Sequence, residues 1–138
     1  MKELMKTNIY DVNKTIIVVG SCLMDREPDV YTQLEEISKD IYDVCLEETH
    51  INMAITKIAG MLRTYIIEKV IFVSVDKSPH CVQLHYIQDE LCKMMGLNNI
   101  MIENYVADGR KLIKISPEAI SLSKNLIELN NITKENYL

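Results

Sequence analysis

The sequence lacks several patterns that would assign a function directly. It contains no tryptophan, one phenylalanine and four glycines among 138 residues. No Gly-x-Gly-x-x-Gly turn or Walker loop is present to cradle a phosphate. No Gly-x-Ser-x-Gly nucleophile elbow occurs either. These absences leave conventional nucleotide or flavin binding, and hydrolase chemistry of the elbow type, without positive support.

An excess of positive charge and long apolar runs are also missing. Fifteen Lys and Arg residues stand against 20 Asp and Glu residues, and the resulting formal net charge of −5 argues against nucleic acid as a partner. The longest apolar runs, 16–19 and 70–73, are far shorter than the ~20 residues that span a bilayer. Residues 1–14 mix charged and apolar positions, unlike a signal peptide. We therefore expect a cytoplasmic protein that binds neither nucleic acid nor membrane.

Cysteine is present four times but never as Cys-x-x-Cys, which excludes a zinc ribbon and a thioredoxin-type motif. Thiols stay reduced in the cytoplasm, so each cysteine is a core residue, a metal ligand or a reactive thiol before it is half of a disulfide. Cys45 and Cys92 are expected to be structural. Cys22 and Cys81 stand at loop junctions and are the candidates for chemistry.

What is present is an alternation of strand and helix patterns. The stretch 42–46 fits either a short strand or a continuation of the preceding helix, and we favour the strand. Asp108-Gly109 is a two-residue hairpin signal. The expected strands are 15–19, 42–46, 70–75, 100–107 and 111–115, and the expected helices run from Pro28 to about residue 41, over 50–65, over 79–95 with Gly96 as its C-cap, and from Ser116-Pro117 to about residue 129.

This order predicts a single α/β domain over residues 1–138, because strands that alternate with helices form parallel sheets through right-handed crossovers. The fold class is a three-layer Rossmann-like or flavodoxin-like fold. Its mainly parallel sheet is covered on both faces and carries a C-terminal β-hairpin and a final helix. Residues 1–13 are expected to form an N-terminal arm, and residues 130–138 a polar tail.

The candidate site follows from this architecture, because ligands of open α/β sheets bind beyond the carboxyl ends of the strands. Two of the four cysteines and two of the three histidines fall at that edge. The residues that we assign to the edge are Gly20, Ser21 and Cys22 after the first strand, His50 after the second, and Ser78, His80 and Cys81 after the third.

Cys81 has a physical argument of its own. With Ser78 as N-cap it occupies the first helical turn, where unpaired backbone N–H groups and the helix dipole favour a thiolate. His85 lies four positions further along and is its neighbour on the helix. A cysteine and a histidine at this spacing can ligate one metal ion or act as a thiol with a nearby base.

The site residues expected from the sequence therefore fall into three groups. Alternatives stay open for the histidines, since His50 can simply open a helix, His80 can lie on the surface and His85 can be half-buried and hydrogen-bonded. The expected catalytic residues are Cys81 and Cys22; the expected cofactor-binding residues are Gly20, Ser21 and Ser78; and the expected metal ligands are Cys22, Cys81, His85, His80 and His50.

The segment Ser-Pro-His-Cys-Val-Gln-Leu-His-Tyr, residues 78–86, resembles an element of a small, uncharacterised group of prokaryotic α/β proteins, and the similarity extends over most of the chain. The segment is also faintly similar to the iron–sulfur (delta) subunit of some hydrogenases, whose Cys/His-rich turn follows a strand. That resemblance implies an iron–sulfur site. Only Cys81 and His85 match it in kind, and the further cysteines of a cluster are missing, so a single zinc or iron ion is the metal alternative.

Two functions from different classes follow from these observations. The leading hypothesis is a module for thiol-redox chemistry or metal binding, with a protein partner in a larger redox complex or a second copy of itself. The alternative is a module without chemistry that binds a small anion or a nucleotide through the amides at its helix starts, or that only docks on a protein. The placement of the Cys22 and Cys81 sulfur atoms discriminates between them.

Overall fold

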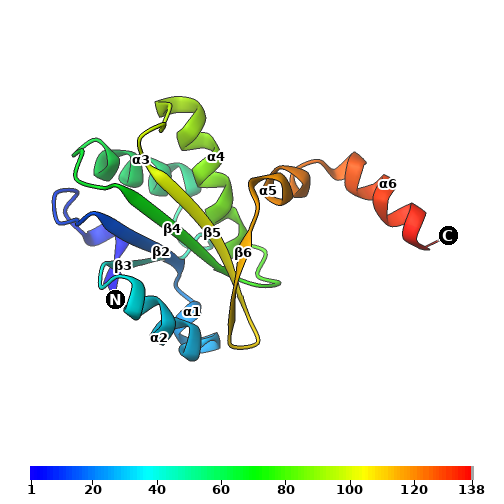
Figure 1. Cartoon of the computed structure of the whole chain (residues 1–138), viewed down its shortest axis with the longest axis horizontal. Coiled ribbons are helices and arrows are strands. Elements are labelled where there is room, and N and C mark those ends of the chain that lie inside the picture. The colour runs from blue at the N-terminus through cyan, green and yellow to red at the C-terminus, as the bar shows by residue number, and fades with distance from the viewer. Residues whose placement is uncertain (138) are drawn as a thin grey trace.

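The structure, a computed structural model that describes residues 1–137, contains one six-stranded sheet in the order β1-β3-β2-β4-β5-β6 (Figure 1). All neighbouring strands are parallel except β5 and β6, which form an antiparallel hairpin. The predicted Rossmann-like or flavodoxin-like class is thereby confirmed. The strands are β1 (Lys2–Glu3), β2 (Thr15–Gly20), β3 (Ile41–Val44), β4 (Lys69–Val75), β5 (Met101–Asp108) and β6 (Lys111–Ile115).

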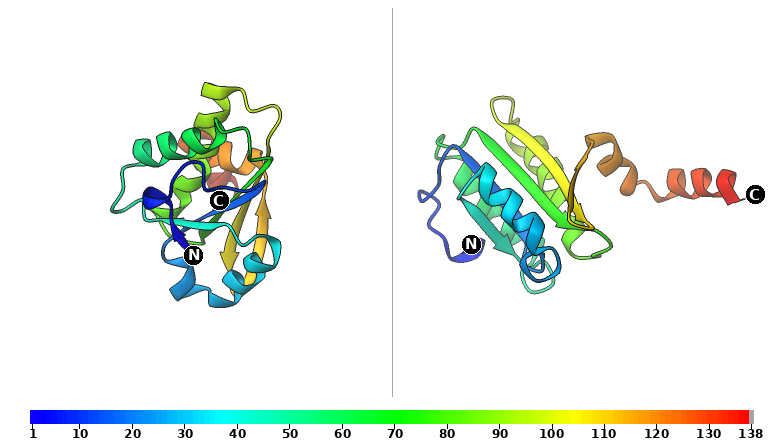
Figure 2. Two further views of the ribbon diagram at one scale, coloured as in Figure 1. Left: turned by 90° about the vertical axis from the view of Figure 1, so that its left-hand side faces the viewer. Right: turned by 60° about the horizontal axis from the view of Figure 1, so that its bottom comes forward.

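Helices cover both faces of the sheet, as Figures 1 and 2 show. α3 (Ile51–Leu62) and α4 (Leu84–Met95) lie on one face, and α1 (Leu23–Arg26) and α2 (Pro28–Ile37) lie on the other. The central strands β2 and β4 are buried along nearly their whole length, which explains why their sequences are continuous β-branched runs without polar alternation. None of the helices in residues 1–137 has the length and apolar character needed to cross a membrane.

The order of the strands creates a crevice between the ends of β2 and β4. The connection that leaves β2 leads to β3 on one side, while β4 pairs with the other side of β2. The chain connections therefore diverge at the carboxyl ends of β2 and β4, which is the topological switch point where open α/β sheets bind ligands. Gly20 ends β2 there, and Val75 ends β4.

The β5–β6 hairpin is confirmed, but its turn lies one residue later than Asp108-Gly109 suggested. Asp108 pairs with Lys111, so the two central residues are Gly109 and Arg110, with φ of 55° and 68°. Such left-handed angles match the twist of a two-residue hairpin. The Glu27 carboxylate accepts the backbone N–H groups of Gly109 and Arg110 at 3.2 and 3.1 Å, which holds the hairpin tip at the start of α2.

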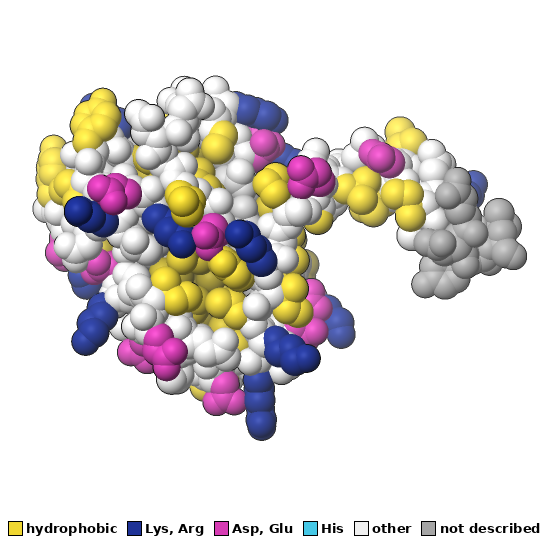
Figure 3. All heavy atoms as spheres, in the orientation of Figure 1, with side chains coloured by type: hydrophobic (Ala, Val, Ile, Leu, Met, Phe, Trp, Pro, Cys, Tyr) yellow, Lys and Arg dark blue, Asp and Glu magenta, His cyan; other side chains and the backbone are white. Residues whose placement is uncertain are grey.

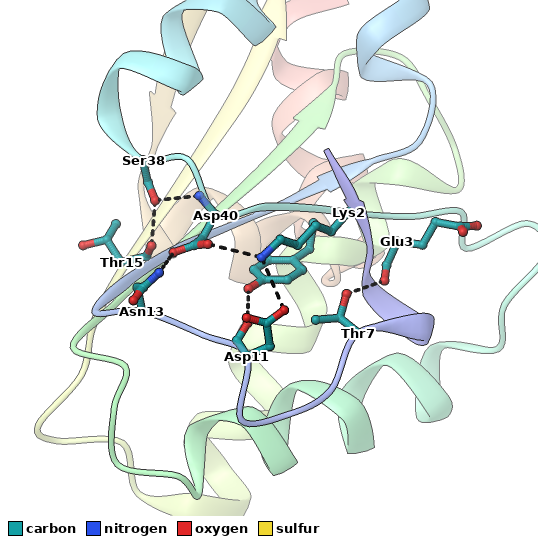
Figure 4. A network of polar contacts seen from close by, with 9 residues as sticks. Lys2, Glu3, Thr7, Asp11, Asn13, Thr15, Ser38 and Asp40 are labelled. Carbon is teal, nitrogen blue, oxygen red and sulfur yellow. Dashed lines mark hydrogen bonds and ion pairs between the residues drawn. The ribbon is translucent and has the colours of Figure 1, made fainter.

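The N-terminal residues are part of the domain rather than a separate arm. β1 pairs with β3, and Leu4 is completely buried in the 3-10 helix Leu4–Lys6. Lys2 lies 3.6 Å from the Asp40 carboxylate, and the Tyr42 hydroxyl donates to the Asp11 carbonyl oxygen at 2.8 Å (Figure 4). A two-residue strand is too short to produce a hydrophobic period, so the sequence pattern did not reveal it.

The C-terminal region differs from the expected helix and polar tail. α5 (Pro117–Ser123) ends at Ser123, and α6 (Leu126–Tyr137) then projects away from the body through most of the expected tail (Figure 2). Asn125 stands before α6 as its N-cap, because its side-chain oxygen accepts the Glu128 N–H at 3.3 Å; its side-chain amide also donates to the Glu128 carboxylate at 3.1 Å. This Asn-x-x-Glu signal was present in the sequence. Residue 138 of the expected tail lies outside the described residues.

Candidate functional site

A cavity of about 290 Å³ opens at the switch point between β2 and β4. Another cavity, of about 430 Å³, lies at the opposite edge of the sheet, but no cysteine or histidine is among its lining residues, so it offers no comparable chemistry. The switch-point cavity is lined by the loops that follow β2, β3 and β4. Its lining residues are Gly20, Ser21, Cys22, Arg26, Val44, Cys45, Leu46, Glu47, Lys77, Ser78, Pro79, His80 and Cys81.

Gly20 brings the loop after β4 into direct contact with the end of β2. A Cβ atom built on Gly20 would lie 2.3 Å from Cys81 Sγ, which is too close for any real contact. The absence of a side chain at position 20 therefore creates the space that the Cys81 thiol occupies. The backbone N–H of Val75 donates to the same sulfur atom at 3.2 Å.

Cys22 and Cys81, which lie far apart in the sequence, meet at this point. The Sγ atoms of Cys81 and Cys22 lie 2.3 and 3.8 Å from the position that a Gly20 Cβ would take, so the two thiols are neighbours beside Gly20. Cys22 is half-buried, whereas Cys81 is only 5% exposed. Both are free thiols. The structure thus places a pair of neighbouring thiols in the cavity, one buried and one more accessible.

The expectation that Cys81 is a stabilised thiolate is wrong, because the pKa of its thiol is raised and not lowered. The helix expected from Pro79 does not begin there, because Cys81–Gln83 form a 3-10 turn and α4 starts at Leu84, although Ser78 Oγ does accept the Cys81 N–H at 3.2 Å. The Cys81 side chain, however, packs against Gly20 and is withdrawn from solvent. This burial raises the pKa of the Cys81 thiol to about 12, against the opposing effect of hydrogen bonds from the Val75 and Gly20 backbone. Desolvation therefore outweighs these hydrogen bonds, and Cys81 is a protonated thiol at neutral pH.

His85 was expected to lie beside Cys81, but it belongs to a separate polar network with Ser74 and Asn104. It is 2% exposed on α4 and contacts the sheet. Its Nε2 lies 2.7 Å from Ser74 Oγ, and its Nδ1 lies 2.9 Å from Asn104 Oδ1. Asn104 Nδ2 in turn donates to Gln88 Oε1 at 2.6 Å, so Asn104 Oδ1 is an acceptor and His85 Nδ1 carries the proton.

Desolvation lowers the pKa of His85, although its hydrogen bond to Asn104 opposes the shift. Because both ring nitrogens are occupied by protein groups, His85 has no free nitrogen for a metal ion. The physical reason is the strand register, which aligns Phe72 with Asn104 and so presents Ser74 and Asn104 to the same helix. Spacing along α4 alone could not indicate these partners.

The other two histidines are exposed. His80 lines the cavity, whereas His50 stands at the N-cap of α3 and is not among the lining residues. Within residues 1–137 no three His, Cys, Asp or Glu side chains gather in an arrangement that could hold a metal ion. The five residues that the sequence suggested as metal ligands are therefore divided between the cavity, the α4–sheet interface and the surface.

The three residues that were expected to bind a cofactor, Gly20, Ser21 and Ser78, all line the cavity. Gly20 forms the close contact with Cys81, and Ser78 caps the Cys81 segment. The Ser21 hydroxyl donates to the Asp43 carboxylate at 2.8 Å. The loop after β2 is thus tied to β3 through Ser21.

Cys45, Arg26 and Lys77 also line the cavity, and sequence reasoning named none of them as a site residue. Cys45 was expected inside a strand that ran to residue 46, but β3 ends at Val44, so Cys45 is the first residue of the loop. Arg26 ends α1, the short helix that follows Cys22. Lys77 lies in the tight turn after β4 with φ of 65°, where the Ser78 N–H bonds the Val75 carbonyl oxygen at 3.3 Å.

Sheet order, parallel crossovers and a crevice at the switch point define a doubly wound α/β protein of the Rossmann type. Residues 11–137 match the family described as Rossmann-like domain, and the chain belongs to that family. No curated protein and no solved structure matches the chain. The family assignment supports the predicted kinship with small α/β proteins, while the likeness of residues 78–86 to the hydrogenase subunit stays a prediction.

Proposed function

We propose that the chain is a thiol–disulfide module in which Cys22 and Cys81 cycle between a dithiol and a disulfide. The observation that supports this proposal is the position of both sulfur atoms beside Gly20, at 2.3 and 3.8 Å from the place of a Cβ there. Their unequal exposure suggests unequal roles. Cys22, half-buried on the cavity wall, is the thiol that attacks from the cavity, and the buried Cys81 is the thiol that resolves the intermediate.

The oxidant in this proposal is a small-molecule disulfide. The Cys22 thiolate attacks one of its sulfur atoms, which forms a mixed disulfide and expels one thiolate that takes up a proton. Cys81 then loses its proton and attacks Cys22 Sγ, which forms the Cys22–Cys81 disulfide and expels the second thiolate, again protonated. Two protein thiols are oxidised and one disulfide is reduced to two thiols, so electrons and protons balance.

The raised pKa of Cys81, about 12, makes the second step the slow one. A thiol that stays protonated is a poor nucleophile, so the mixed disulfide should accumulate at neutral pH and resolve faster as the pH rises. We do not extend the proposal to a metal ion. The separation of the histidines and the occupied ring nitrogens of His85 give metal binding no support among the described residues.

The test is oxidation of the reduced full-length protein with bis(2-hydroxyethyl) disulfide, followed by intact mass measurement and peptide mapping. The expected product has lost two hydrogen atoms and contains a Cys22–Cys81 link. Cys81→Ser should stop at the mixed disulfide on Cys22, and Cys22→Ser should show no rapid reaction. Cys92→Ser is the matched control, because Cys92 is half-buried on α4 and is not among the cavity-lining residues.

Two outcomes would overturn the proposal. One is oxidation that links Cys22 to Cys45, the third cysteine of the cavity, because Cys81 would then have no role. The other is a reaction rate at Cys22 no faster than that of the same protein unfolded in urea at the same pH, since the fold would then contribute nothing to the chemistry.

A further inference from the structure

The mouth of the cavity carries more positive than negative charge, in contrast with the whole chain. The chain has a formal net charge of −5, yet the cavity is lined by Arg26 and Lys77 and by one carboxylate, Glu47. All three are exposed, while Cys81 beneath them is buried. The charged lining residues are therefore accessible to solvent, whereas Cys22 is half-buried and Cys81 is buried.

Neither cation is neutralised by a neighbouring side chain. Among the side chains of residues 1–134, Arg26 and Lys77 take part in no ion pair, whereas Arg110 pairs with Asp29 at 3.3 Å. The carboxylate of Asp43, on the neighbouring strand, already accepts the Ser21 hydroxyl. Two unpaired cations at the mouth of one cavity are available to an anionic ligand.

The backbone at Lys77 strengthens this reading. Its φ of 65° lies in the left-handed region, where a side chain is disfavoured and glycine is the usual residue. The turn nevertheless carries a lysine, and Lys77 is one of the residues that line the cavity. A charged residue at a position that favours glycine is consistent with a role for its charge.

The size of the cavity restricts the ligand. A volume of about 290 Å³ lies just below the range for small-molecule sites, about 300–1,000 Å³. We propose that the thiol pair reacts selectively with low-molecular-weight disulfides that carry carboxylate or phosphate groups, with Arg26 and Lys77 holding the anionic group. This inference rests on the proposed function and adds the chemical class of the substrate.

The first experiment compares three aliphatic disulfides of similar length and different charge: 3,3′-dithiodipropionate, bis(2-hydroxyethyl) disulfide and cystamine. Each rate constant with the full-length protein is divided by that with N-acetylcysteinamide at the same pH, which removes intrinsic reactivity. We expect the dianion to react about tenfold faster than the neutral compound at low ionic strength and the dication to react slowest. The three normalised rates should converge as salt is added. Equal normalised rates at low salt would overturn the inference and leave the proposed function intact.

Substitutions test whether Arg26 and Lys77 cause the faster reaction with the dianionic disulfide. Arg26→Gln combined with Lys77→Gln should remove the preference for the dianion, and Lys77→Gly should weaken it while relieving the left-handed backbone. Lys39→Gln is the control with the same change of charge, because Lys39 is exposed before β3 and away from the cavity. An unchanged preference in the double variant, or an equal loss in the control, would overturn the inference.

A non-reactive analogue separates failure of this inference from failure of the proposed function. Suberate has the shape and charge of 3,3′-dithiodipropionate but has two methylene groups in place of the disulfide. We expect suberate to raise the unfolding temperature of the parent protein and of Cys22→Ser, but not of the Arg26/Lys77 double variant. Binding of suberate without any reaction at Cys22 would overturn the redox function while the anion site stands. No shift at suberate concentrations at which 3,3′-dithiodipropionate shows its rate advantage would overturn the anion site.

Discussion

The Cys81 thiol occupies the volume that a side chain at position 20 would need, since a Cβ on Gly20 would lie 2.3 Å from Cys81 Sγ. Gly20→Ala should therefore force either the thiol or the end of β2 to move, and overpacking of this kind costs about 1–3 kcal/mol of unfolding free energy. Urea unfolding measures the loss. Because Cys81→Ala removes the sulfur atom, the double variant Gly20→Ala/Cys81→Ala should be less destabilised than the two single losses together. Simple additivity of the losses would contradict the steric contact.

The raised pKa of Cys81 predicts slow alkylation. At pH 8 iodoacetamide should modify Cys81 in the folded protein at least about a hundredfold more slowly than in the urea-unfolded protein, because the thiolate is scarce and buried. Mass spectrometry of cavity peptides follows both cysteines in one sample. Cys22, the more exposed thiol of the pair, should be modified first. Modification of Cys81 ahead of Cys22 would contradict the assigned burial.

The same shift predicts loss of stability in alkali. The folded state keeps the Cys81 proton up to a pKa of about 12, while the thiol in the unfolded chain releases it near the ordinary pKa of 9.0. The contribution is therefore fully present below pH 9 and is lost as the pH rises from 9 toward 12. Burial also raises the pKa of Tyr42 to about 12, so the informative quantity is the difference between the parent and Cys81→Ala. The slope of stability against pH above 9 should be shallower in the variant.

The lowered pKa of His85 predicts that the folded protein loses stability in acid. The pKa of His85 is lowered in the folded state, so the unfolded chain binds the proton first as the pH falls below about 6.5. The contribution of neutral His85 is present above that pH and is lost as the pH falls further. Replacement by Gln leaves Ser74 or Asn104 without a partner, at a cost of about 1–3 kcal/mol at pH 7.5. It should also flatten the decline between pH 7 and 5, measured by urea unfolding. An unchanged decline would assign the acid sensitivity to other groups.

The hydrogen bonds between Glu27 and the hairpin tip are expected to contribute to the stability of the fold. The Glu27 carboxylate accepts two backbone N–H groups of the hairpin tip, so Glu27→Ala should lower the unfolding free energy by about 1–2 kcal/mol. Asp29→Ala is the comparison, because Asp29 forms only an exposed ion pair with Arg110 at 3.3 Å and should cost less than about 0.5 kcal/mol. Equal effects of the two substitutions would contradict the role of the paired N–H groups.

The sequence predicted the fold better than it predicted the site. The runs 15–19 and 70–75 became β2 and β4 because a strand buried on both faces is apolar throughout, and Gly96 ends α4 with φ of 58° as a C-cap should. These are local properties that each segment reveals by itself. The placement of Cys22 and Cys81 at one sheet edge was also expected, because the carboxyl ends of parallel strands lie at the same edge.

The errors at the site concern groups that depend on distant segments. The helix-start argument for Cys81 considered only its own turn, but the burial that raises its pKa comes from contact with Gly20 at the end of another strand. His85 was paired with Cys81 by spacing along one helix, while its real partners, Ser74 and Asn104, lie on β4 and β5. The direction of a side chain relative to the sheet decided both cases, and spacing along one segment does not contain that information.

Because α6 projects away from the body of the domain, we expect the domain to fold without it. Figure 3 shows apolar side chains along the arm that α5 and α6 form, and Leu126 and Ile127 are each 77% exposed. Between residues 126 and 134 only Leu129 is half-buried. Truncation after Asn125 should therefore shift the unfolding temperature by less than about 3 °C. The control is Ile120→Ala, since Ile120 on α5 is buried and its truncation should cost about 2–5 kcal/mol. A large fall in the truncated protein, dependent on protein concentration, would show that α6 is packed against a second copy in solution.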